Sequence, residues 1–203
     1  MAPAPAARPG GARRRINGAS EVFLSDAKAN ARISHIASFF PSLQRKQVMM
    51  SLFSDATLIN ADGSSASAPT ITTGILFSSS WCPDCVPFVA RLGEMYECLN
   101  EEEKKIEVIF VSSDRDASSM AAYMKAKHPD WLAVAYDDPI RNGLKRKFGC
   151  CAGSEAAALN VNPRKYGIPA LVIVKPDGSI IKENGVPEVE SFQGGDELPS
   201  AWQ

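Results

Sequence analysis

An apolar run of strand length at residues 71–77 is followed, after a short turn, by a strongly amphipathic segment at residues 83–99. In that segment apolar side chains recur every three or four positions, which places them on one face of a helix. Pro83 suits the first turn, where a missing N–H removes no hydrogen bond. The apolar face consists of Cys85, Phe88, Val89, Leu92, Met95, Tyr96 and Leu99. The pattern predicts a buried strand leading directly into a helix that packs on the sheet.

Strands and helices alternate along the rest of the chain. A second buried strand is expected at residues 106–111. Helices are expected from an Asp116 cap to Lys127 and at residues 139–148 after Asp137 and Asp138. Two hairpins are expected. The first follows residues 57–60 and turns at Asp62–Gly63. The second spans residues 171–181 and turns at Pro176-Asp177-Gly178. The predicted fold class is therefore α/β, with a central mixed β-sheet flanked by helices and an N-terminal hairpin extension.

The N-terminal segment differs in composition from the rest of the chain. Residues 1–20 contain four arginines and no acidic residue, and they are rich in Ala, Pro and Gly. Such a segment buries too little apolar surface to offset its loss of conformational entropy. We expect residues 1–50 to be a flexible extension and residues 51–203 to be the compact domain. An Arg-rich, acid-free N-terminus is also typical of mitochondrial transit peptides, but the prolines and glycines disfavour the amphipathic helix these form.

Charge and cysteine content exclude several classes of protein. With 22 basic and 23 acidic residues the net charge is −1, which provides no overall attraction for nucleic acid. No apolar run approaches the roughly 18 residues of a membrane-spanning helix. Five cysteines are an odd number and too few for a disulfide-dense secreted scaffold. We expect a monomer in a reducing compartment, the cytoplasm, with the mitochondrion as the alternative, and neither nucleic acid nor membrane as a partner.

The sequence Trp81-Cys82-Pro83-Asp84-Cys85 occupies the turn between the first buried strand and the long helix. Two cysteines three positions apart at a helix start lie one turn apart, near enough to form a disulfide. Backbone N–H groups and the positive helix end stabilise a thiolate on Cys82, the form that attacks disulfides. Cys85 lies deeper in the helix and is expected to be the resolving thiol, with Trp81 packed beside the pair.

A zinc site is the main alternative for this spacing. It requires a second pair of ligands, and Cys150 and Cys151 are adjacent, which is the wrong spacing for a zinc ribbon. We therefore predict redox chemistry and no metal. Two further functions stay open from the residues alone. One is a non-catalytic interaction module that uses the surface around Trp81 and Pro169; the other is a redox sensor whose extra cysteines report oxidation.

Pro169 stands immediately before the predicted strand at residues 171–174. A proline entering a strand lacks the N–H that a β-ladder uses. Taken alone, it is most simply an ordinary trans proline at a strand start.

Several separated motifs resemble tryparedoxins and nucleoredoxins. They are residues 81–85, 108–116, 131–138, 168–171 and 176–178, and the resemblance covers residues 51–192. It implies a thioredoxin-like fold in which Pro169 is cis and faces the dithiol, leaving the Ile168 backbone free to pair with a substrate strand. Trp81, Pro83, Ile168 and Pro169 are then the substrate-binding residues.

The resemblance also implies an activity. Cys82 and Cys85 would reduce protein disulfides by dithiol–disulfide exchange without a bound cofactor. The pair would be reduced in turn by a low-molecular-weight dithiol, trypanothione or another. The expected partners are disulfide-containing proteins such as thiol peroxidases.

This chain departs from the family pattern at three places. Asp84 stands where the family has a second proline; its charge disfavours a nearby thiolate, or it accepts the proton of Cys85, or it favours the helix dipole. Asn184-Gly185 is followed by Val186-Pro187, where tryparedoxins carry a basic residue. Residues 149–165 resemble an insertion before Pro169, and its Cys150 and Cys151 are either accessory thiols that relay the disulfide or plain loop thiols. The charges at residues 114–116 either meet polar substrate groups or are solvated.

Overall fold

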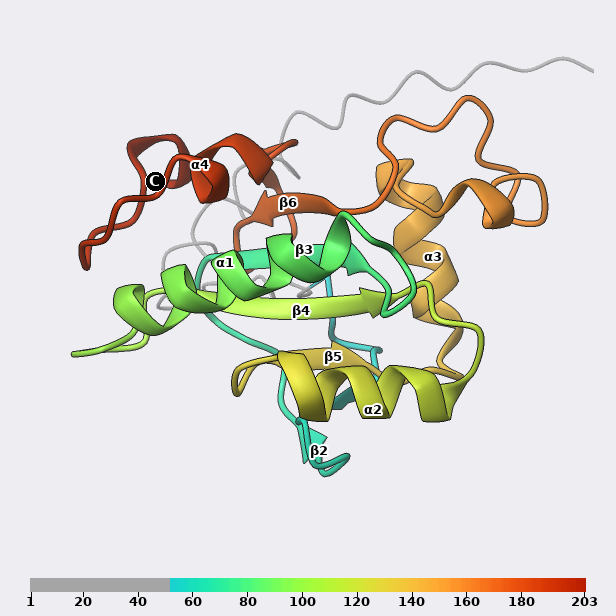
Figure 1. Ribbon diagram of the computed structural model, residues 1–203, viewed down its shortest axis with the longest axis horizontal. Coiled ribbons are helices and arrows are strands. Elements are labelled where there is room, and N and C mark those ends of the chain that lie inside the picture. Colours follow the sequence, from blue (N-terminus) through green and yellow to red (C-terminus); the bar gives the residue numbers. More distant parts are fainter. Residues whose placement is uncertain (1–51) are drawn as a thin grey trace, which may run out of the picture. The chain divides into compact units, whose positions relative to one another are not determined.

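The computed structural model describes residues 52–203, and the expectations for residues 1–50 lie outside this range. The described residues form a seven-stranded sheet in the order β2-β1-β5-β4-β3-β6-β7. Figure 1 shows β6, β3, β4 and β5 crossing the middle of the molecule in this order. The predicted central mixed sheet flanked by helices is therefore confirmed.

The strands are short, and the longest lie at the centre of the sheet. They are β1 (Leu58–Ile59), β2 (Ser65–Ala66), β3 (Thr73–Ser78), β4 (Glu107–Ser112), β5 (Leu132–Val134), β6 (Ala170–Val174) and β7 (Ile180–Lys182). β3 pairs in parallel with β4 and antiparallel with β6, and β4 pairs in parallel with β5. Both predicted hairpins are present, β1 with β2 and β6 with β7.

The helices confirm most of the predicted boundaries. They are α1 (Cys85–Leu99), α2 (Ala117–Lys127), α3 (Pro139–Phe148) and α4 (Val186–Glu190), with short 3₁₀ helices η1 (Gly153–Glu155) and η2 (Ser200–Trp202). Asp116 caps α2 by accepting a hydrogen bond from the Ser119 N–H at 2.7 Å, and Asp138 caps α3 in the same way. The sequence patterns missed β5 and α4, because three and five residues are too few to display a period.

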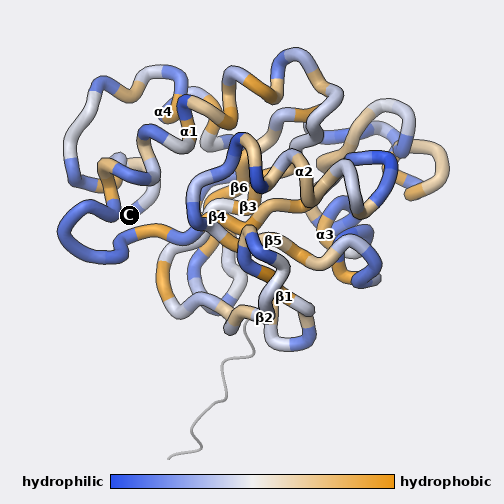
Figure 2. Tube along the Cα trace, turned by 60° about the horizontal axis from the view of Figure 1, so that its bottom comes forward, coloured by the Kyte–Doolittle hydropathy of each residue, from blue (hydrophilic) through white to orange (hydrophobic). Residues whose placement is uncertain are grey.

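Two apolar clusters cover the two faces of the sheet. Successive residues of β3 alternate between them, since Leu76 belongs to one cluster and Ile75 and Phe77 to the other. The predicted apolar face of α1 is buried in the first cluster with α2 and α4, whereas α3 packs in the second. Figure 2 shows the hydrophobic residues gathered in the central strands. The carboxyl end of β3, where the two cysteines follow, thus rests on a sheet covered on both faces.

Candidate active site

The turn that carries the two cysteines is two residues longer than expected, because the helix begins at residue 85 and not at residue 83. α1 begins at Cys85, with Asp84 as its N-cap residue, so Pro83 precedes the helix and is not in its first turn. The Cys85 N–H donates to the Cys82 carbonyl at 3.2 Å and closes a tight turn. The Asp84 side chain makes no capping hydrogen bond. Pro83 and Asp84 are both exposed, so the middle of this turn lies at the protein surface.

The two thiols have different surroundings. Cys82 is 5% exposed, and Cys85, at the start of the buried face of α1, is fully buried. Burial, together with a hydrogen bond to Cys82, raises the pKa of Cys85 to about 12. The Cys85 thiol is therefore protonated at neutral pH until something removes its proton. This asymmetry suits a pair in which one sulfur reacts with outside molecules and the other reacts only inside the site.

The segment before β6 lies against Cys82. The Ile168–Pro169 peptide bond is cis, as the resemblance implies. The Cys82 Sγ donates to the Ile168 carbonyl oxygen at 3.7 Å, across 86 positions of sequence. β3 and β6 are antiparallel neighbours, and Phe77 pairs with Ala170. The residues that follow β3 and the residues that precede β6 therefore meet at the same edge of the sheet. The structure thus brings Cys82, Cys85, Ile168 and Pro169 together.

Trp81 stands at the edge of this site. It is 44% exposed, and its indole N–H donates to the Ser113 carbonyl just beyond β4 at 3.0 Å. The hydrogen bond fixes one edge of the ring and leaves the other part of the side chain open to solvent. Trp81 therefore forms an apolar surface beside the dithiol.

Asp114 has a structural role that the sequence did not reveal. It is 4% exposed, so it is neither a solvated loop charge nor open to a substrate. One carboxylate oxygen accepts hydrogen bonds from the Ser80 N–H and hydroxyl at 2.8 and 2.7 Å, and the other accepts from the Ser112 hydroxyl at 2.7 Å. Asp114 thereby ties the end of β4 to the residues just before Trp81.

The insertion at residues 149–165 folds over its own small core. Its ends are joined by a hydrogen bond from the Lys165 N–H to the Gly149 carbonyl at 2.8 Å. Cys150 and Cys151 are both fully buried, the first in the core cluster with α3, the second with Leu159 and Val161. Burial raises the pKa of Cys150 to about 12 and also raises that of Cys151. Both thiols are therefore protonated and shielded in this conformation.

A buried ion pair attaches the insertion to α3, and no motif pointed to it. Lys145 of α3 has no exposed side-chain surface, and its Nζ lies 2.5 Å from Glu155 Oε1. Burial lowers the pKa of Lys145, and Glu155 opposes this shift. The second oxygen of Glu155 accepts hydrogen bonds from the Ser113 hydroxyl at 2.6 Å and the Ala152 N–H at 3.2 Å. Glu155 thus links the insertion to the residue that also holds Trp81.

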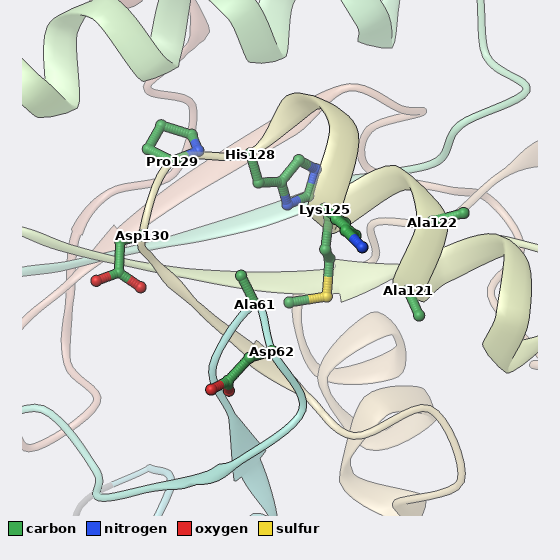
Figure 3. Close-up of a pocket in the computed structure, with 9 residues that line it drawn as sticks. Ala61, Asp62, Ala121, Ala122, Lys125, His128, Pro129 and Asp130 are labelled. Carbon is green, nitrogen blue, oxygen red and sulfur yellow. The ribbon is translucent and has the colours of Figure 1, made fainter.

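One pocket begins at Trp81, next to Cys82 in the sequence, and a larger one lies elsewhere. A pocket of about 430 Å³ is lined by Trp81, Ser113, Asp114, Arg115, Ser154 and Glu155, so the insertion forms one of its walls. The larger pocket, of about 730 Å³, lies between the N-terminal hairpin and α2 and contains neither cysteine (Figure 3). His128 there accepts a hydrogen bond from Trp131 at 2.9 Å, and burial lowers its pKa to about 3. The lining of this pocket includes Asp62, Lys125 and Asp130 beside His128, but it lies on elements that carry neither cysteine.

Within residues 52–203, no group of three His, Cys, Asp or Glu side chains is placed to hold a metal ion. None of the helices described there is long and apolar enough to span a membrane.

Comparisons with known proteins agree on the fold. A family model described as thioredoxin-like matches residues 71–180. Nucleoredoxin of Bos taurus is 32% identical over 136 residues, which cover 65% of this chain and 27% of that protein. The tryparedoxin structure from Trypanosoma brucei has a TM-score of 0.57 and 25% identity, covering 75% of this chain and 99% of that one. A tryparedoxin II complexed with glutathionylspermidine has a TM-score of 0.52 and 27% identity, with coverages of 70% and 94%.

Proposed function

This chain belongs to the thioredoxin-like family, and on that premise we propose that it reduces disulfide bonds in proteins through Cys82 and Cys85. Its relatives in sequence and structure are nucleoredoxins and tryparedoxins, as the motifs predicted. The chain spans about a quarter of the length of the nucleoredoxins it matches, so the proposal concerns the activity of this domain alone.

The observation that carries the proposal is the position of Cys82. Its sulfur lies 3.7 Å from the Ile168 carbonyl, between a buried partner thiol and an exposed tryptophan. A disulfide that approaches along the Ile168 segment reaches Cys82 before it reaches Cys85. The partly open backbone of Ile168 offers a polar edge with which an extended substrate segment can pair.

The proposed reaction proceeds in two exchanges. The Cys82 thiolate attacks one sulfur of the substrate disulfide, which breaks and releases the other sulfur as a thiolate that takes up a proton. Cys85 then loses its proton and attacks the Cys82 sulfur, releasing the second substrate thiolate, which is protonated in turn. The substrate gains two electrons and two protons, and Cys82 and Cys85 become a disulfide. An external dithiol reverses that change and is itself oxidised.

Burial of Cys85 supports the order of these steps. With its pKa near 12, Cys85 does not compete with Cys82 for the first attack. Once Cys82 is held in a mixed disulfide, Cys85 stands at the other end of the same tight turn, and the reaction becomes intramolecular. The second exchange is therefore fast although the attacking thiol is weakly acidic.

Trypanothione or another low-molecular-weight dithiol is the reductant that we propose. A similar tryparedoxin II was solved in complex with glutathionylspermidine. The absence of a basic residue after Asn184-Gly185 argues for a reductant that differs in detail from that of the tryparedoxins. Disulfide-containing proteins, thiol peroxidases among them, are the proposed oxidants.

Insulin reduction driven by dithiothreitol tests the activity. Cys82→Ser should abolish turnover, and Cys85→Ser should accumulate a covalent mixed disulfide that mass spectrometry detects. Cys98→Ser is the matched control, because Cys98 lies on α1 outside the site and should leave turnover unchanged. Full multiple turnover by Cys85→Ser would show that the assigned roles are wrong. A wild-type protein that binds partners but reduces no disulfide would instead be an interaction module.

A further inference from the structure

We propose that the insertion at residues 149–165 makes the surface beside Cys82 a docking site for an acidic segment of the substrate protein. This inference rests on the proposed function and adds the substrate class. The insertion supplies Ser154 and Glu155 to the wall of the pocket that begins at Trp81. A protein that presents its disulfide to Cys82 therefore contacts the insertion with the residues that flank the disulfide.

The two carboxylates of this pocket are already engaged. Both oxygens of Asp114 accept hydrogen bonds from the Ser80 and Ser112 hydroxyls. Glu155 forms its ion pair with the buried Lys145 and accepts from the Ser113 hydroxyl. Every oxygen of these two carboxylates already has a partner within the protein. Neither carboxylate therefore needs a basic ligand to pair with. The acidic groups of this pocket therefore serve the fold.

Two arginines at the same surface are available. Arg115 lines the pocket and is exposed, and within residues 52–203 no hydrogen bond or ion pair engages its guanidinium. Arg164 is also exposed, and it donates a single hydrogen bond, from Nη1 to the Cys151 carbonyl at 3.1 Å. Each guanidinium has N–H donors to spare, and a carboxylate is the ligand that such a planar group binds best.

Arg164 lies between the insertion and the segment that leads to Ile168. A methyl carbon added at Gly153 would lie 3.6 Å from Arg164 Nη2, and one added at Gly167 would lie 3.4 Å from Nη1. The guanidinium thus sits between the pocket wall and the residue before Ile168, whose carbonyl contacts Cys82. Both distances are ordinary van der Waals contacts, and the insertion carries the arginine to this position.

The exposed carboxylate of Asp84 stands between the two cysteines, but it lines a separate pocket together with Glu94, Glu190 and Arg91. Glu94 follows Cys85 by nine positions of helix, about 14 Å along the axis. A substrate segment on the Ile168 side of Cys82 therefore meets arginine rather than carboxylate. Charge complementarity selects aspartate or glutamate in the substrate near its disulfide.

The test measures how fast three peptide disulfides oxidise the reduced protein in a single turnover. The peptides are identical except that the residues flanking one cysteine are Asp, Asn or Lys. Hydroxyethyl disulfide, small and uncharged, serves as the reference substrate. We expect the Asp peptide to react about fivefold faster than the Asn peptide and the Lys peptide to react more slowly, with differences that shrink as salt is raised.

Variants locate the effect. Arg115→Gln removes a charge without breaking a contact and should reduce the preference for Asp, and Arg115→Glu should reverse it. Arg164→Gln should also reduce it. Lys127→Gln, the same change of charge at the far end of α2, should preserve it, and hydroxyethyl disulfide should react equally with all four.

Each outcome decides a different point. Equal rates for the three peptides, with hydroxyethyl disulfide still reduced, would overturn the docking site and leave the proposed function intact. A preference that survives in both Arg115 variants would overturn the assignment to this surface. A faster Lys peptide would mean that the Asp84 pocket selects the substrate instead. Failure to react with any disulfide would overturn the proposed function and the docking site together.

Discussion

Replacing Glu155 by Gln tests whether the insertion is held by its buried ion pair. The substitution keeps the shape of the side chain and its hydrogen bond from Ser113, but it removes the counter-charge of Lys145. Lys145 has no exposed side-chain surface, whereas Glu155 is 24% exposed. Removing one partner of a buried pair is destabilising by about 3–5 kcal/mol. Since water reaches Glu155, we expect a loss at the lower end, about 3 kcal/mol.

The pH dependence follows from the direction of the Lys145 pKa. Burial lowers this pKa and Glu155 raises it. Loss of the Glu155 charge in the Glu155→Gln variant therefore lowers the pKa of Lys145 further. At pH values between the lowered pKa of Lys145 in the folded protein and the ordinary lysine pKa, the unfolded chain binds more protons than the folded one. Stability of the variant must therefore rise with pH in the alkaline range. The destabilisation should be smaller near pH 9 than near pH 7.

Urea unfolding followed by circular dichroism measures both effects. Glu183→Gln is the matched control, because Lys165 and Glu183 are also 2.5 Å apart but about half exposed. Breaking that surface pair should change stability by less than about 1 kcal/mol. In the double variant Lys145→Met/Glu155→Gln most of the lost stability should return, since no charge is left buried. A loss for Glu155→Gln no larger than that for Glu183→Gln would refute the reasoning.

Three further predictions concern the thiols and His128. Iodoacetamide at neutral pH should label Cys82 and leave Cys85, whose pKa is near 12, unlabelled in peptide maps of the reduced protein; equal labelling would contradict the burial argument. Asp84→Pro should speed that labelling up to about fivefold, because an exposed carboxylate near the thiolate is removed, and an unchanged rate would leave Asp84 with no effect on the thiolate. The folded protein keeps His128 neutral down to about pH 3, while the unfolded chain protonates it below pH 6.5, so stability should fall by about 2 kcal/mol from pH 7 to pH 5. His128→Asn, titrated in the same way by urea unfolding, should lack that part of the slope.

Much of the fold was predictable from the sequence because it depends on near neighbours. The buried face of α1, the Asp116 and Asp138 caps and the turn at Gly63, whose φ is +84°, each arise within a few residues. Three local patterns encode them: apolar residues that recur every 3.6 positions, a short side chain that accepts a hydrogen bond at a helix start, and a glycine in a tight turn. The pair Cys82 and Cys85 at a strand–helix turn belongs to the same class of signal.

Only the tertiary structure decided what surrounds the two cysteines. The Ile168 carbonyl reaches Cys82 because β6 pairs with β3, and Asp114 reaches Ser80 because β4 lies on the other side of β3. The ion pair of Lys145 with Glu155 depends in the same way on how the insertion folds back over α3. Such contacts join residues far apart in sequence, and no local pattern encodes which strands become neighbours. Sequence alone therefore determined the cysteine pair and its helix, while the order of strands in the sheet determined which distant residues contact them.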